Sequence, residues 1–299
     1  MSSAPGVVRT VRNFAGLVRL SHSIFALPFA VLSLLVATAG TPSLATLVCV
    51  VGAVVAARTA AMAYNRLADR EHDARNPRTA NREIPRGAVS PRSAAMLTGA
   101  AALGFLACCR ALSPLCFWLG VPTLVWLLGY SHVKRFSALC HLWLGVALGI
   151  SPLAAWLAAD GAFGPRLWAP FVLGLAVASW VAGFDVLYAC QDVDFDRRHG
   201  LHSLPARFGP ARAMMVARVL HALALAGFLV FGQLAGLGTA WQLGVLAAGA
   251  LLVWQHRLLR PDDLSRIQMA FFTANGIIAL LLLVAGCVDI YALGTLRPS

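Results

Sequence analysis

Charged side chains are scarce in this chain. Asp, Glu, Lys and Arg make up 12% of the 299 residues, and 59% are hydrophobic, whereas about a quarter of the residues in a soluble domain are charged. Lys134 is the only lysine. Seven of the 12 acidic residues lie in two short segments, 69–83 and 192–196. This composition excludes an ordinary water-soluble domain and makes the two acidic segments stand out.

Cysteine spacing excludes a zinc site of the usual kind. The seven cysteines form no CxxC pair and have no Cys/His metal spacing. Most lie inside apolar stretches and are expected to be small core residues. The first apolar run is too long for the hydrophobic part of a signal peptide, so we expect no cleavable leader.

Long apolar runs are abundant. A helix of about 20 apolar residues crosses a bilayer, and nine runs approach this length: 23–40, 43–64, 94–112, 114–130, 138–159, 168–190, 213–236, 239–255 and 268–292. The sequence therefore predicts an all-α, polytopic membrane protein with nine transmembrane helices. We expect one transmembrane domain over 1–299, with 1–21 as a cytoplasmic N-terminal segment.

The net charge of +12 would suit a nucleic-acid-binding protein, but its distribution favours a membrane topology. Basic residues gather in every second loop: 9–19, 66–92, 134–135, 197–212 and 257–266. The other loops hold only Arg110, Arg166 and Arg297. Because basic loops stay in the cytoplasm, we predict a multi-pass protein of the inner (cytoplasmic) cell membrane. Its N-terminus would be cytoplasmic and its C-terminus outside. We expect the lipid bilayer as a partner and no nucleic-acid partner.

The first acidic segment has helical spacing. Asn65, Asp69 and Asp73 are four residues apart, which places them on one helical face. Mg²⁺ prefers such oxygen ligands and commonly keeps substrate phosphates as its others. A solvated helix end, neutralised by Arg66 and Arg70, is the alternative interpretation.

The second acidic segment repeats the pattern. Asp185, Tyr188, Asp192 and Asp196 follow at spacings of 3, 4 and 4 and also share a helical face. Asp185 lies inside an apolar run, where a carboxylate costs up to ~3 kcal/mol and is usually functional. Asp194 points to the opposite face, as a solvated charge would. Two acidic stripes on one side of the membrane predict two metal ions around one diphosphate.

Basic side chains follow the first stripe. Arg78 and Arg82 belong to a segment with four arginines in twelve residues, and guanidinium groups fork onto phosphate oxygens. A topology-setting loop that touches anionic lipid is the alternative. Arg58 lies seven residues before Asn65, on the same face inside the helix, and indicates a polar cavity.

A third polar feature lies between the two stripes. Tyr130 and Lys134 are four residues apart, so their side chains can point together. An interfacial tyrosine next to topology-setting charges explains the pair equally well.

Together these residues resemble the UbiA superfamily of intramembrane prenyltransferases. The segment 58–90 resembles the family's first aspartate-rich motif with its arginine loop, and 185–209 resembles the second motif. Tyr130-x3-Lys134 resembles the short motif between them. The resemblance implies a nine-helix bundle around a central cavity, with Mg²⁺ as cofactor. The implied partners are a polyprenyl diphosphate and a small aromatic acceptor, and no protein partner is implied.

The resemblance implies alkylation of an aromatic ring in quinone (menaquinone or ubiquinone) biosynthesis. The metal ligands would be Asn65, Asp69, Asp73, Asp192 and Asp196. The diphosphate would contact Arg78, Arg82, Tyr130 and Lys134. The catalytic residues would be Asp69, Asp192, Lys134, Arg58, Asp185 and Tyr188, of which the last three would border the acceptor or shield an allylic cation.

One position departs from the family pattern. The first motif often begins Asn-Asp, but here Arg66 follows Asn65. This variant, with Gln191 before Asp192, is most similar to bacterial members of the futalosine route to menaquinone. For that branch the resemblance implies an aminodeoxyfutalosine-type acceptor in place of 4-hydroxybenzoate.

A secondary transporter of an organic anion or metal ion is the alternative function. Transporters place polar sites near the bilayer midplane on broken helices, whereas these polar residues cluster at the cytoplasmic helix ends. A phosphatidyl-transferring enzyme would also use aspartates and Mg²⁺, but its DG-x2-AR type signature is absent.

Overall fold

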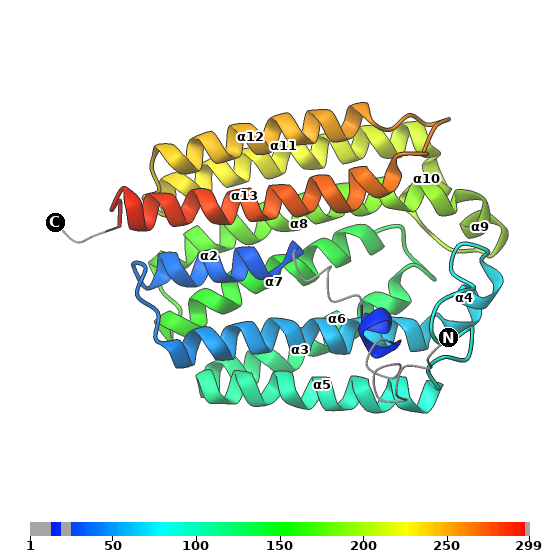
Figure 1. Cartoon of the computed structure of the whole chain (residues 1–299), viewed down its shortest axis with the longest axis horizontal. Coiled ribbons are helices and arrows are strands. Elements are labelled where there is room, and N and C mark those ends of the chain that lie inside the picture. Colours follow the sequence, from blue (N-terminus) through cyan, green and yellow to red (C-terminus); the bar gives the residue numbers. More distant parts are fainter. Residues whose placement is uncertain (1–12, 19–24, 297–299) are drawn as a thin grey trace, which may run out of the picture.

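The computed structural model describes residues 13–18 and 25–296. Within these ranges the chain is helical, and the only β-type pairing is an isolated bridge between Arg260 and Asp263. The long helices run side by side as one bundle (Figure 1). The predicted all-α class is therefore confirmed.

Helices of 11 to 25 residues occupy the nine predicted apolar runs. They are α2 (Leu27–Ala37), α3 (Leu44–Ala68), α5 (Pro91–Leu112), α6 (Pro114–Val133), α7 (Cys140–Asp160), α8 (Trp168–Ala189), α11 (Pro210–Leu234), α12 (Thr239–Arg257) and α13 (Asn275–Cys287). The short helices are α4 (Arg70–Arg75), α9 (Val193–Arg198) and α10 (Leu204–Phe208), with 3-10 turns η2 (Pro165–Leu167) and η3 (Cys190–Asp192). Two π-helical turns, η4 (Met269–Ala274) and η5 (Val288–Ala292), flank α13.

Seven helices in the described ranges are long and apolar enough to cross a membrane, which makes the chain a multi-span membrane protein. The two runs that fall short are 23–40 and 239–255. The first contains α2, an apolar helix of 11 residues. The second forms α12, of 19 residues, which carries Gln242, Gln255 and His256.

Serine caps explain where three of the long helices begin. Ser43, Ser90 and Ser113 have extended backbones, and each side chain accepts a hydrogen bond from the N–H three residues later. These bonds satisfy N–H groups that lack a partner within the helix. Proline follows two of these caps, at the start of α5 and α6, where its missing N–H is harmless.

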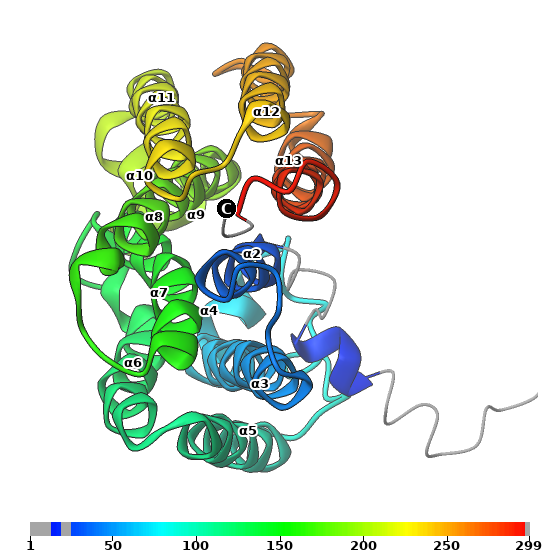
Figure 2. The same ribbon diagram turned by 90° about the vertical axis from the view of Figure 1, so that its left-hand side faces the viewer.

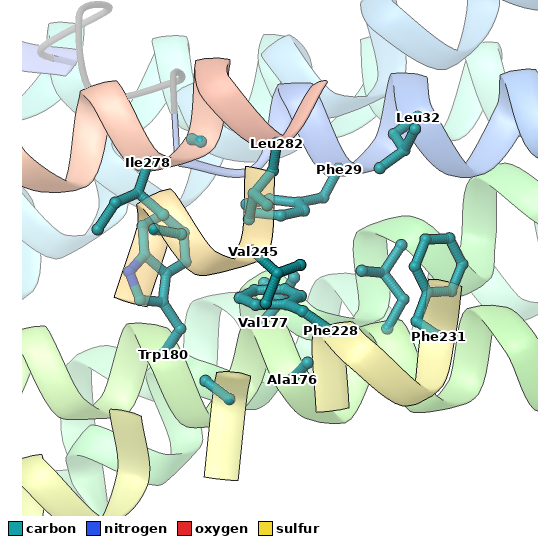
Figure 3. Close-up of a cluster of buried hydrophobic side chains, with 14 of the residues drawn as sticks. Phe29, Leu32, Ala176, Val177, Trp180, Phe228, Phe231, Val245, Ile278 and Leu282 are labelled. Atoms are coloured by element: carbon teal, nitrogen blue, oxygen red, sulfur yellow. The ribbon is translucent and has the colours of Figure 1, made fainter. Parts of the chain in front are cut away.

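The bundle centres on α2. Seen along the helices, α2 lies between α3, α7 and α13 (Figure 2), and it packs against all three. Its Phe29 stacks on Phe228 of α11 with ring centroids 5.6 Å apart and meets Trp180 of α8 edge-on at 5.4 Å. Figure 3 shows this core, which Val245 of α12 and Leu282 of α13 complete.

Glycines bring α7 and α8 into close contact. A Cβ atom on Gly145 would lie 2.2 Å from the carbonyl oxygen of Ala178, and one on Gly149 would lie 2.4 Å from that of Gly174. Only glycine fits such an approach between helix backbones. The two helices consequently hold the ends that carry part of the candidate site in a fixed relation.

One end of the bundle collects the short helices. The helices α4, α9 and α10 lie together at the end where α12 connects to α13 (Figure 1). The basic segments 66–92 and 197–212 are at this end. Both acidic segments therefore lie at the same end of the molecule.

Candidate active site

The acidic segments do not lie on unbroken helices, which corrects the predicted helical stripes. The helix α3 ends at Ala68, Asp69 is its cap, and α4 begins at Arg70. Aspartate is a poor residue in a helix interior because its side chain competes for backbone groups. The backbone still links Asp69 N to Asn65 O at 2.9 Å and Asp73 N to Asp69 O at 2.8 Å, so the fourfold spacing keeps these side chains together.

The second segment is broken in the same manner. The helix α8 ends at Ala189, the 3-10 turn η3 follows, and α9 begins at Val193. The side chains of Asp185, Tyr188, Asp192 and Asp196 nevertheless line one cavity. Asp194 is exposed to solvent, as the sequence predicts.

Both acidic segments face a single cavity of about 190 Å³. Its lining includes the predicted residues Asn65, Asp69, Asp73, Arg78, Arg82, Tyr130, Lys134, Asp185, Tyr188, Asp192 and Asp196. Arg58 is not among the lining residues, because it lies seven residues, or about 10 Å, farther along α3. A larger cavity of about 310 Å³ between α11 and α12 has no charged residue in its lining.

Asp69 is surrounded by basic and amide groups from α3 and from the residues that follow α6. Lys134 Nζ donates to Asp69 Oδ2 at 2.6 Å, and Asn65 Nδ2 donates to the same oxygen at 3.1 Å. Arg135 lies 3.6 Å from Asp69 Oδ1, which is too far for a hydrogen bond. Nearby, burial and the Lys134 ammonium both lower the pKa of His72.

Asp73 is held within its own loop. Arg82 Nη1 donates to Asp73 Oδ1 at 2.7 Å, and the Thr79 hydroxyl donates to the Asp73 carbonyl oxygen at 3.0 Å. Asp73 is buried. The arginine loop thus folds back on the first acidic segment.

Asp192 joins the two acidic segments. Arg78 donates to it with a two-pronged fork, Nε to Oδ1 at 2.9 Å and Nη2 to Oδ2 at 2.6 Å, and Asn76 Nδ2 donates to Oδ1 at 3.0 Å. Arg78 Nη1 also donates to Tyr188 Oη at 3.3 Å. Burial alone would lower the pKa of Arg78, but the Asp192 hydrogen bond and charge outweigh it and raise this pKa. Residues of the first motif's loop are therefore bound directly to the second motif.

The hydrogen-bond partners of Asp196 and Asp185 are a serine hydroxyl and a histidine ring. Ser203 Oγ donates to Asp196 Oδ2 at 2.6 Å. Asp185 Oδ2 lies 2.7 Å from His141 Nδ1. Asp185 lies within α8, about one turn before that helix ends, whereas Asp196 lies beyond the break, on α9.

The donor set suits a divalent cation that keeps several outside ligands. Asp69 Oδ1 and Asp73 Oδ2 are buried and have no hydrogen-bond partner among the described residues. No group of three or more His, Cys, Asp or Glu side chains is close enough in the described ranges to form a closed metal cage. Mg²⁺ is commonly bound by one or two carboxylates plus substrate phosphates and water, so these residues fit it better than a metal that needs a full protein cage.

Sequence reasoning did not single out Asn76, His141 or Ser203 as site residues, yet all three line the cavity. His141 carried a usable signal, because an ionisable side chain within an apolar run is usually functional. Asn76 and Ser203 are polar residues of polar loops and had no distinguishing pattern.

A model of the UbiA prenyltransferase family matches residues 26–287. A 4-hydroxybenzoate octaprenyltransferase of Aeromonas hydrophila is 34% identical over 249 residues, covering 83% of this chain and 85% of that protein.

Solved structures share the fold. A UbiA homologue from Aeropyrum pernix K1 superposes with a TM-score of 0.82 at 34% identity, covering 90% of this chain and 98% of that one. A UbiA homologue from Archaeoglobus fulgidus, bound to DMAPP and Mg²⁺, has a TM-score of 0.68 at 20% identity, covering 93% of this chain and 99% of that one.

Proposed function

The chain belongs to the UbiA prenyltransferase family, and from this premise we propose that it transfers a polyprenyl group from a polyprenyl diphosphate to an aromatic acceptor, with Mg²⁺ as cofactor. The observation that carries the proposal is the cavity that both acidic segments share with Lys and Arg side chains. Carboxylates alone suit a metal, and basic side chains alone suit an anion. A cavity with both suits a metal-bound diphosphate.

The metal would be held by carboxylate oxygens that have no hydrogen-bond partner or whose partner can be replaced by a metal ion. We assign Asn65, Asp69 and Asp73 to one Mg²⁺ and Asp192 with Asp196 to a second. When bound, Mg²⁺ stabilises negative charge that develops on the leaving diphosphate. The Archaeoglobus fulgidus homologue bound to DMAPP and Mg²⁺ supports this cofactor.

The basic residues would bind and orient the diphosphate. Arg78, Arg82 and Lys134 each reach a carboxylate of the cavity within 2.7 Å, so their cationic groups already point into it. When the allylic C–O bond breaks, its electron pair goes to the diphosphate oxygen, and these fixed cations stabilise that charge. The Tyr130 hydroxyl, also in the lining, completes the diphosphate contacts in this proposal.

The deeper wall of the cavity would contact the acceptor. Tyr188 lies against Phe271 with ring centroids 4.2 Å apart, and Asp185 lies on the same helix one turn earlier. These residues form a partly aromatic wall suited to an aromatic ring and to a transient cation. Arg58 would border this region from α3, outside the cavity lining.

The acceptor class follows from the relatives and from the variant motif. The octaprenyltransferase of Aeromonas hydrophila supports an aromatic acid in quinone biosynthesis. Arg66 after Asn65 and Gln191 before Asp192 favour the menaquinone branch over the ubiquinone branch. A substrate with a long apolar tail explains why the site opens within a membrane protein.

The proposed topology has nine crossings. Besides the seven long spans, α2 and α12 would complete the bundle, because both pack against membrane-length helices. The basic end of the bundle, with α4, α9 and α10, would face the cytoplasm of the inner membrane. The N-terminus would then be inside and the C-terminus outside.

The transporter alternative gains no support from the cavity. The carboxylates of the cavity lie at one end of the bundle, and three of them pair with Lys or Arg. A transporter, by contrast, needs a site near the midplane that both sides can reach. Membership in a family of prenyltransferases favours the enzyme.

The direct test is a transfer assay with purified protein in lipid vesicles. Geranyl, farnesyl and longer prenyl diphosphates are each paired with 4-hydroxybenzoate and with an aminodeoxyfutalosine-type aromatic acceptor, with and without Mg²⁺. We expect a prenylated aromatic product that disappears with EDTA and returns with added Mg²⁺. The absence of such a product with every pair, or a product indifferent to EDTA, would contradict the proposal.

A further inference from the structure

The histidine His141 has a defined place beside the acceptor end of the cavity. It lies in the first turn of α7 and is 3% exposed. Its Nδ1 atom is 2.7 Å from Asp185 Oδ2 on α8, and its Nε2 atom is 3.2 Å from the backbone nitrogen of Leu204 on α10. One ring therefore joins three separate helices at the site.

The Leu204 contact fixes the proton positions on the ring. Leu204 is the first residue of α10, where the backbone N–H has no acceptor within the helix. A backbone N–H can only donate, so His141 Nε2 is the acceptor in this contact and Nδ1 is left to donate to Asp185. His141 therefore orients a carboxylate through its Nδ1–H.

This arrangement leaves the other oxygen of Asp185 available. Oδ1 makes no hydrogen bond to any described residue, while the side chain is 18% exposed and lines the cavity. Asp185 lies within α8, seven residues before Asp192, which is in the turn that follows the end of this helix. A base in this position would face the ring of an acceptor whose partner diphosphate sits at the Asp192 end.

The other carboxylates of the cavity already have a proposed role as metal ligands. Asp69, Asp73 and Asp192 are each paired with Lys or Arg and belong to the proposed metal ligands, as does Asp196. Asp185 is the cavity carboxylate of the described chain that is outside this set.

We propose that Asp185 is the general base of the transfer and that His141 is its positioning residue. The inference rests on the proposed function. The first carbon of the prenyl group forms a bond to a ring carbon of the acceptor as its bond to the diphosphate oxygen breaks. The substituted ring carbon then loses its proton to Asp185 Oδ1, and the C–H electron pair restores the aromatic ring. His141 keeps its own proton and holds Oδ2 throughout.

The test measures two products in each sample: released diphosphate and prenylated aromatic acid. The variants are Asp185→Asn, which keeps the shape but cannot take a proton, His141→Phe, which removes the donor, and His141→Asn, whose amide can donate to Asp185. His202→Asn is the matched control, because its side chain is exposed on the loop that precedes α10 and its backbone contacts are retained.

We expect Asp185→Asn to lower prenylated product at least ~100-fold, the usual range for loss of a general base, while diphosphate release continues and prenyl alcohol forms with water. His141→Phe should show the same uncoupling, by roughly 10-fold, as with outer partners of metal ligands. His141→Asn should recover part of the transfer, and the KM for prenyl diphosphate should be unchanged in all variants.

A parallel fall of release and transfer in the near-isosteric Asp185→Asn and His141→Asn variants would overturn the inference, as would unchanged transfer. These results differ from failure of the proposed function, in which the wild-type protein itself would form no prenylated aromatic and both proposals would fall.

Discussion

At the scale of single residues, the cavity carboxylates each accept a hydrogen bond from a different side chain. The donor and acceptor pairs are Lys134 with Asp69, Arg82 with Asp73, Arg78 with Asp192, Ser203 with Asp196, and His141 with Asp185. Three of the donors are cations. In the proposed reaction, these cations would turn from carboxylate to phosphate when a metal-bound diphosphate enters, so each would serve both the free and the bound site.

Arg78 makes the strongest contact of this network, because it donates two hydrogen bonds to Asp192, a carboxylate of the second acidic segment. Arg78→Gln should lower the rate of prenyl transfer about 10- to 100-fold, since a hydrogen bond to a charged group contributes roughly 1.5–3 kcal/mol. Arg78→Lys keeps the charge without the fork and should fall between. Initial rates at saturating acceptor measure the effect.

The control for this prediction is Arg70→Gln. Arg70 pairs with exposed Glu71 on the surface, where an ion pair contributes at most ~1 kcal/mol. Its transfer rate should match the wild type. Equal rates for Arg70→Gln and Arg78→Gln would refute the role given to Arg78.

At the scale of elements, a buried carboxylate fixes the turn between α11 and α12. Asp289 is fully buried and accepts hydrogen bonds from the backbone N–H groups of Gly238, Ala240 and Trp241 at 2.8–3.2 Å. These are N–H groups at the start of α12 that have no partner within the helix. The last π-helical turn of the chain thereby caps a neighbouring helix.

Asp289→Ala should lower the free energy of unfolding by about 2–4 kcal/mol, because several buried N–H groups lose their acceptor. Chemical denaturation in detergent, followed by tryptophan fluorescence, measures the change. Asp262→Ala, on an exposed loop, should stay within ~0.5 kcal/mol of the wild type. Similar stabilities for the two variants would show that Asp289 is not a cap of this strength.

The contact between α7 and α8 makes a second prediction at this scale. Gly149→Ala places a Cβ within 2.4 Å of the Gly174 carbonyl oxygen, so the helices have to separate. We expect a loss of about 1–3 kcal/mol, as for overpacked cores, and lower activity because both helices carry cavity residues.

Gly99→Ala on α5 is the matched control, since its added Cβ meets nothing within 4 Å. That substitution should leave stability unchanged or raise it slightly, because alanine favours a helix. A Gly149→Ala protein as stable and active as Gly99→Ala would contradict the close packing.

At the scale of the whole molecule, the sequence predicts the helical bundle and most of the cavity lining. Apolar runs suffice to predict the seven membrane-length helices of the described chain, because length and hydropathy alone decide which helices can span a membrane. The fourfold spacing of Asp69 and Asp73 survives the helix break between α3 and α4, so the pattern still gathers the right side chains.

Contacts between distant residues could not be predicted in this way. Asn76 and Asp192 are 116 residues apart and His141 and Asp185 are 44 apart, and both contacts depend on how the helices pack. Arg58 was expected at the cavity because it shares a helical face with Asn65, but depth along the helix separates them. The helical face and the residue spacing predict the direction in which a side chain points. The distance between two side chains also depends on how the helices pack.

The central claim is that the two acidic segments form one catalytic site. A double-mutant cycle of transfer rates with Asp69→Asn, Asp192→Asn and the double variant tests it most directly. If both carboxylates act on one metal-bound diphosphate, each single change should remove most of the activity and the double variant should be scarcely worse, as for residues that act as a unit. Losses that multiply, as they do for independent sites, would contradict a shared site.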